Sequence, residues 1–72
     1  MFCDSALAHA AFNAGIFHAD AHAYLQRARR ARDPRRRARL VGAARMTWHD
    51  YLHARAEVRR LIRRHARRPR PG

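Results

Sequence analysis

Lysine is absent from this 72-residue chain, glutamate occurs once and cysteine once. A single cysteine excludes a disulfide within the chain, and the absence of any run of 18 apolar residues excludes a transmembrane helix. Proline occurs only at positions 34, 69 and 71, so two long stretches contain no helix breaker. A chain this short buries only about 60% of its unfolded surface, so a solitary core is expected to be marginal, and oligomerisation or docking onto something larger is a usual remedy.

Basic residues are missing from positions 1–26, and the start of the chain therefore lacks the positive segment of a secretory signal. Cys3 is expected to be a free thiol in a reducing compartment. Together with the missing transmembrane segment, these features predict a cytoplasmic protein.

The charge is carried by 17 basic residues, all arginine, against five acids, giving a formal net charge of +12. All the arginines lie between positions 27 and 72. Guanidinium groups suit bidentate contacts with phosphate or carboxylate. So large an excess of one sign predicts a strongly acidic partner, either nucleic acid (DNA or RNA) or an acidic protein surface.

The first predicted helix spans about residues 5–32 and begins at Ser5, a favoured N-cap residue. One apolar stripe follows helical spacing at Leu7, Ala10, Ala14, Phe17, Ala21, Leu25 and Ala28. A second stripe on the opposite side comprises Phe12, Ile16, Ala19 and Ala23. A helix that is apolar nearly all round is normally buried on several sides. The second stripe therefore predicts a surface for self-association or docking, with scattered surface apolar residues as the alternative.

The second predicted helix spans about residues 34–67, because Asp33 is a favoured N-cap and Pro34 a favoured first residue. Its apolar side is expected to hold Leu40, Val41, Ala44, Trp48, Tyr51, Leu52, Val58 and Ile62. A tight connection makes two such helices antiparallel neighbours.

The predicted fold class is therefore all-α, a two-helix antiparallel hairpin forming one small domain over residues 1–72. Positions 68–72 are expected to be a flexible tail of arginine and proline. We expect the hairpin to be completed by dimerisation into a four-helix bundle or by docking on a larger partner.

The arginines predicted to bind a polyanion are Arg29, Arg30, Arg35, Arg36, Arg37, Arg45, Arg60, Arg63, Arg64 and Arg67. Three of them, Arg35–Arg37, fall in the first turn of the second helix, where the helix dipole is positive and cations are unfavourable. We therefore expect an external polyanion to hold these three, and their replacement by glutamine to stabilise the free protein. Trp48 and Tyr51 are expected to pack in the core.

Two histidine pairs, His18 with His22 and His49 with His53, have the i,i+4 spacing that can supply two imidazoles to a metal ion. Helical phase argues against a shared four-histidine site, because His49 and His53 lie with the arginines, so no metal is predicted. No nucleophile has an evident base, and no cofactor motif is present. The chain is therefore predicted not to be an enzyme.

The leading functional hypothesis is a non-enzymatic binder of nucleic acid, or an accessory subunit of a nucleoprotein assembly, acting on the phosphate backbone. The alternative is a protein–protein adaptor or inhibitor of the compact phage type. Such a protein would insert its apolar first helix into a groove of its partner and clamp an acidic surface with its arginines.

Overall fold

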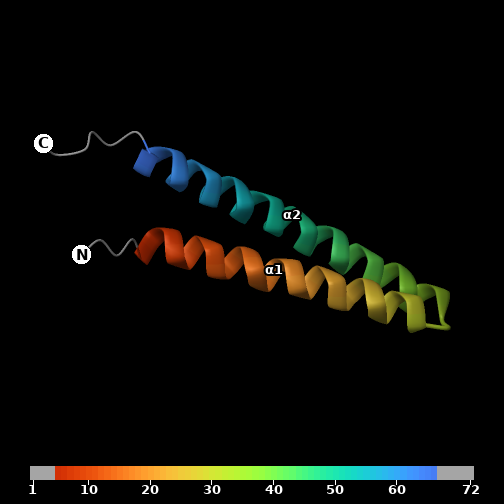
Figure 1. Cartoon of the computed structure of the whole chain (residues 1–72). Helices are drawn as coiled ribbons and strands as arrows, with labels where there is room; N and C mark the ends of the chain where they lie inside the picture. The colour runs from red at the N-terminus through yellow and green to blue at the C-terminus, as the bar shows by residue number, and fades with distance from the viewer. Residues whose placement is uncertain (1–4, 67–72) are drawn as a thin grey trace, which may run out of the picture.

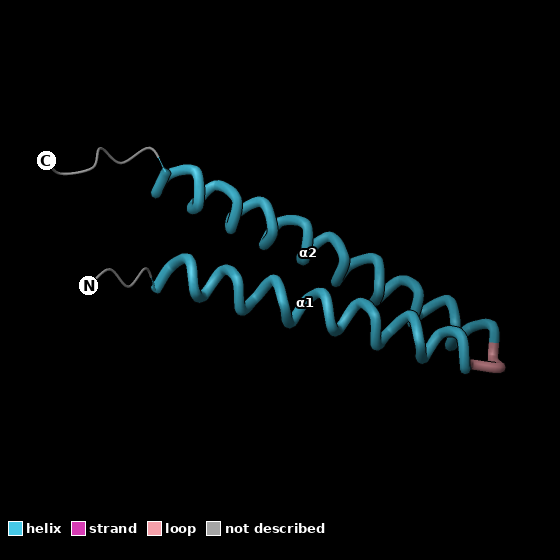
Figure 2. The backbone as a smooth tube through the Cα atoms, viewed as in Figure 1, coloured by secondary structure: helices cyan, strands magenta, loops and turns pink. Residues whose placement is uncertain are grey.

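A computed structural model of the chain describes residues 5–66, which form helix α1, Ser5–Arg30, and helix α2, Pro34–Ala66. The two helices run antiparallel and lie side by side (Figure 1), joined by one short loop (Figure 2). The all-α helical hairpin predicted from the sequence is confirmed. Helix α1 ends at Arg30, two residues earlier than predicted. Arg67 and the predicted tail at 68–72 lie outside the described residues.

The turn between the helices is fixed by Asp33. Its side-chain Oδ1 accepts a hydrogen bond from the main-chain N–H of Arg35 at 3.1 Å, and its carbonyl accepts from the N–H of Arg37 at 2.9 Å. Pro34 follows as the first helical residue, where its missing N–H costs nothing. The capping chemistry expected from the sequence therefore starts α2 where it was predicted to start.

The two helices meet along a seam whose positions alternate by three and four residues. On α1 these positions are Leu7, Ala10, Ala14, Phe17, Ala21, Tyr24 and Ala28, and the spacing continues to Ala31 in the loop. On α2 they are Leu40, Ala44, Thr47, Tyr51, Ala54, Val58, Leu61 and His65. A seven-residue repeat of this kind keeps one face of each helix turned towards its partner, as in a coiled coil. Thr47 is accommodated there because its hydroxyl donates to the carbonyl of Ala43 at 2.8 Å.

The core of the hairpin is thin and made mostly of alanine. Among residues 5–66 the buried apolar residues are Ala10, Ala21, Ala28, Ala44 and Leu61. The three most completely buried, Ala21, Ala28 and Ala44, lie in the half nearest the turn, where the ribbons also run closest in Figure 1. Because a buried methyl group contributes only about 0.8 kcal/mol, this core leaves little margin of stability.

The prediction that Trp48, Leu52 and Ile62 pack inward is wrong. Their exposed fractions are 42%, 40% and 51%, respectively. The cause is the seven-residue repeat, which places other residues in the seam and these three beside it. On α1 the predicted stripe contains Leu25 and does not include Tyr24. Tyr24 occupies the seam, whereas Leu25 is exposed.

Within residues 5–66, neither α1 nor α2 contains a stretch apolar enough over a sufficient length to cross a bilayer.

Candidate functional site

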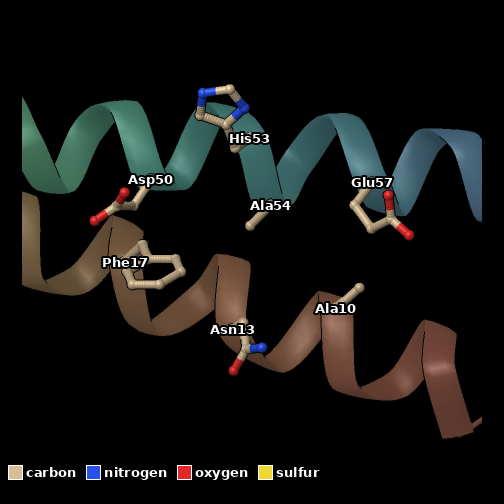
Figure 3. A pocket seen from close by; sticks show the side chains of 7 residues that line it. All are labelled: Ala10, Asn13, Phe17, Asp50, His53, Ala54 and Glu57. Atoms are coloured by element: carbon tan, nitrogen blue, oxygen red, sulfur yellow. The ribbon is translucent and has the colours of Figure 1, made fainter.

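The hairpin has two flanks, one on each side of the seam. Ring contacts place His18 of α1 and Trp48 of α2 on the same flank. A groove on the opposite flank is lined by Asn13 of α1 and by Asp50 and Glu57 of α2 (Figure 3). We call the first side the aromatic flank and the second the acidic flank.

Four rings form a cluster at the aromatic flank. The ring centroids of Trp48 and Tyr51 are 4.9 Å apart, and that of His18 lies 5.0 Å from Tyr51 and 6.1 Å from Trp48. His22 extends the cluster along α1, with its ring centroid 4.5 Å from His18 in an edge-to-face arrangement. Tyr51 is half-buried in the seam, whereas Trp48, His18 and His22 are exposed. The cluster is therefore anchored in the seam and open to solvent.

Arginines continue the aromatic flank along α2. A second stripe with spacings of three and four residues runs beside the seam through Arg45, Trp48, Leu52, Arg55, Arg59 and Ile62. Residues at these spacings are neighbours on a helix surface. Every member of the stripe is exposed. Guanidinium groups and large apolar side chains thus share one accessible surface. The aromatic flank comprises this stripe with His18, His22 and Leu25 of α1.

The acidic flank holds an open groove of about 480 Å³ between the helices. Its lining residues are Ala10, Asn13, Phe17, Asp50, His53, Ala54 and Glu57. None of these seven has a hydroxyl or thiol that could act as a nucleophile. Figure 3 shows Ala10 and Ala54 pointing towards the opposite helix and the ring of His53 directed away from α1.

Three of the four carboxylate side chains within residues 5–66 lie on one side of the hairpin. Asp20 lies seven residues after Asn13, so it shares the acidic flank with Asp50 and Glu57. The remaining acid within residues 5–66 is Asp33, which caps α2. The aromatic flank therefore contains no carboxylate among the described residues, and its arginines are not neutralised there.

One ion pair joins an arginine to a carboxylate in the described part of the chain. Arg60 donates to both oxygens of Glu57, from Nε at 3.0 Å and from Nη2 at 2.5 Å. These hydrogen bonds hold the pKa of the Glu57 carboxyl below its usual value and raise the pKa of Arg60. All 14 arginines between residues 5 and 66 are exposed. Most of the positive charge is thus available to a partner.

The arginines predicted to bind a polyanion are spread over several faces. Arg29, Arg30 and Arg35–Arg37 surround the turn, and Arg45 lies on the aromatic flank. The other three described members of the set, Arg60, Arg63 and Arg64, lie near the end of α2 on the faces away from the aromatic flank. Arg67 lies outside the described residues.

Arg37 differs from its neighbours in having a partner within the chain. Its Nη2 donates to the carbonyl oxygen of Ala31 at 2.7 Å. The poorly placed cluster at the start of α2 is therefore partly stabilised by the end of α1, without an external ligand.

The histidine pairs do not come together. The ring of His18 contacts those of Trp48 and Tyr51, whereas the ring of His53 points away from α1 (Figure 3). Within residues 5–66, no group of three or more histidine, cysteine, aspartate or glutamate side chains is arranged to hold a metal ion.

No protein-family model, curated protein or solved structure matches this chain. The function is therefore inferred from the arrangement of the chain's own residues.

Sequence reasoning overlooked Trp48, Arg55 and Arg59 as members of one surface. The sequence contains the pattern that would have revealed this surface, because the alanine-rich seam positions recur at strictly alternating spacings of three and four residues. Extending that repeat from Ala44 through Tyr51 and Val58 assigns the seam and leaves Trp48 beside it. The prediction from hydrophobicity instead groups Trp48, Leu52 and Ile62 with Leu40 and Tyr51 on one side of the helix.

The predicted self-association surface lies on the outer face of α1. Phe12 is 67% exposed and Ile16 is 42% exposed, and Ala19 and Ala23 are also exposed. The second helix covers none of the four. The surplus apolar stripe expected from the sequence is thus present on the hairpin, and what it contacts stays a prediction.

Proposed function

We propose that the protein binds nucleic acid through contacts between its arginines and the phosphate backbone, without catalysing a reaction. The observation that supports this most directly is that one flank of the hairpin carries arginines and no carboxylate among the described residues. Arginines on the aromatic flank are exposed and have no carboxylate beside them, whereas Asp20, Asp50 and Glu57 lie on the other flank. A polyanion can approach the aromatic flank without meeting like charge.

The geometry of the stripe suits a chain of phosphates. Arg45 and Arg59 are 14 residues apart, which corresponds to about 21 Å along the helix axis. That length equals about six phosphates of one strand along the axis of a DNA duplex, at about 3.4 Å each. Arg55 lies between them, and the arginines around the turn, such as Arg35 and Arg36, add further positive charge at one end. One backbone can therefore contact several guanidinium groups along the hairpin.

The dependence of binding on salt tests the proposal. Fluorescence anisotropy of labelled duplex DNA, single-stranded DNA and RNA would be measured between about 50 and 200 mM salt. Each phosphate neutralised contributes about −0.9 for duplex DNA, or about −0.7 for a single strand, to the slope of log affinity against log salt concentration. We expect a slope of about −2 or steeper for at least one of the three. Absence of binding at the lower salt concentration would overturn the proposal.

The outer face of α1 favours a second role, association with another protein subunit. Phe12 and Ile16 are one helical turn apart and leave a large apolar surface exposed. Pairing two hairpins through this face would give a four-helix bundle with arginines outward on both sides. We propose that such a bundle is a subunit of a cytoplasmic nucleoprotein assembly. The same face would alternatively serve an adaptor that inserts α1 into a partner groove.

Sedimentation velocity tests self-association. We expect the wild-type protein to form a dimer and the double variant Phe12→Ser, Ile16→Ser to sediment as a monomer with unchanged helicity by circular dichroism. A wild-type monomer at all concentrations would exclude the bundle and leave docking on a different protein.

A further inference from the structure

The geometry of the aromatic flank points to a ligand with unpaired bases. We infer that Trp48 stacks on a base of single-stranded nucleic acid while neighbouring arginines hold its phosphates. This inference rests on the proposed function and adds the class of nucleic acid and the residue that contacts its bases.

Trp48 has the exposure and the support that a stacking platform needs. Its side chain is 42% exposed, so part of the indole ring is accessible. Tyr51 contacts it from the seam at 4.9 Å between ring centroids, and His18 contacts it from the other helix at 6.1 Å. Contacts from both helices limit the orientations of the ring before a ligand arrives. A base that stacks there therefore has little side-chain entropy to overcome.

The arginines beside Trp48 are spaced to hold the sugar–phosphate chain of the same ligand. Arg45 precedes Trp48 by three residues and Arg55 follows it by seven, which places them about 4.5 Å and 10.5 Å away along the helix axis. A positive groove or stripe with an aromatic platform is the combination that single-strand binders use, and stacking tolerates any base because every base has a π-face. Bases in a duplex already stack on each other and cannot reach Trp48.

A second copy of the chain fits this surface poorly. In a two-fold interface the same surface meets itself. Pairing the aromatic flank with its own copy would bring Arg45, Arg55 and Arg59 of both chains together, with no carboxylate on that flank in the described residues. Repulsion between these charges favours an anionic occupant. An anionic bilayer surface has the right charge but presents no flat rings to stack, and it is one of the outcomes of the test below.

Intrinsic fluorescence reports on the site directly, because Trp48 is the only tryptophan in the chain. The full-length protein would be titrated with a thymidine oligonucleotide, with an abasic oligonucleotide of equal length, and with a DNA duplex. We expect the thymidine oligonucleotide to quench Trp48 and to bind more tightly than the abasic one at equal salt. The abasic chain should bind through its phosphates alone and leave the fluorescence nearly unchanged.

Two variants separate stacking from general effects, with their affinities measured by anisotropy. Trp48→Ala should weaken binding of the thymidine oligonucleotide by roughly 5- to 150-fold, the range for loss of one stacked base, and should leave abasic binding unchanged. Trp48→Phe, which keeps an aromatic ring, should retain most of the affinity. Met46→Ala serves as the control, because Met46 is 73% exposed and lies two residues away on a different face of α2.

The possible results distinguish this inference from the proposal on which it rests. Equal affinity for the thymidine and abasic chains, with no change in Trp48 fluorescence, would overturn stacking and leave phosphate binding intact. Failure of both chains to bind would overturn the proposed function as well. Quenching by anionic phosphatidylglycerol vesicles with no response to the thymidine oligonucleotide would assign the flank to a membrane surface. A fluorescence shift with protein concentration alone would assign it to a second copy.

Discussion

Arg37 reaches across the turn and donates a hydrogen bond from Nη2 to the carbonyl oxygen of Ala31 at 2.7 Å. Ala31 directly follows α1, so the guanidinium lies beside the negative end of the α1 dipole as well as the positive end of the α2 dipole. The antiparallel hairpin therefore offsets the unfavourable position of this cation. An external polyanion is therefore needed to explain only Arg35 and Arg36, because Arg37 has a partner within the chain.

This contact predicts different effects for two neighbouring substitutions. Arg37→Gln removes the hydrogen bond, which contributes about 0.5–1.5 kcal/mol. Arg36→Gln removes the same charge from the first turn of α2 and should stabilise the free protein by about 0.3–1 kcal/mol at low salt. Urea unfolding should therefore show Arg36→Gln to be the more stable of the two. The reverse order would contradict the stabilising role of the Arg37 contact.

The alanine seam predicts strong position dependence for a bulky substitution. Ala21 is 1% exposed between the helices, so Ala21→Leu should overpack the seam and destabilise the hairpin by about 1–3 kcal/mol. Ala56→Leu is the matched control, because Ala56 is an exposed alanine on α2 that lies outside the seam. Thermal unfolding followed by circular dichroism measures both. Equal midpoints for the two variants would show that the helices do not meet at Ala21.

The sequence was sufficient to predict the hairpin, its turn and the surplus apolar stripe. Asp33 and Pro34 carry local capping chemistry that does not depend on tertiary contacts, so they could be interpreted from the chain alone. The seam was harder, because alanine is only weakly apolar and a large residue such as Trp48 dominates any assignment based on hydrophobicity. The Arg37 contact could not be foreseen, since it depends on how the ends of both helices meet in space.

Gly42 offers a test of helix α2 that leaves its contacts unchanged. A Cβ added at Gly42 meets no atom within 4 Å, so alanine fits there without strain. Gly42→Ala should stabilise the protein by about 0.5–1 kcal/mol, because glycine loses more backbone freedom on folding. Urea unfolding should show a higher midpoint with an unchanged slope. A lower midpoint would mean that Gly42 lies against a partner, such as a second copy.

Glu57 predicts a specific response to pH. Hydrogen bonds from Arg60 lower the pKa of Glu57 in the folded protein. At pH values above the pKa that Glu57 has in the unfolded chain, the ion pair contributes fully to the stability of the fold. This contribution is lost as the pH falls through the lower pKa of Glu57 in the folded protein. This loss of stability therefore occurs at pH values below the ordinary glutamate pKa of about 4.3. An NMR titration of the Glu57 carboxyl should give a midpoint below that value. The midpoint should return towards it in Arg60→Gln, and no difference between the two proteins would contradict the ion pair.

The most direct test of phosphate binding by the aromatic flank compares two triple variants with equal net charge. Arg45, Arg55 and Arg59 lie on the aromatic flank, and Arg60, Arg63 and Arg64 lie on other faces of the same helix. Each set would be replaced by glutamine, and the salt dependence of binding to a single-stranded oligonucleotide would be measured for both variants and the wild type. We predict that the first set reduces the magnitude of the slope by about 2, at 0.7 per phosphate, and that the second set changes it much less. Equal reductions in both variants would show that binding follows bulk charge and would contradict a defined interface on the aromatic flank.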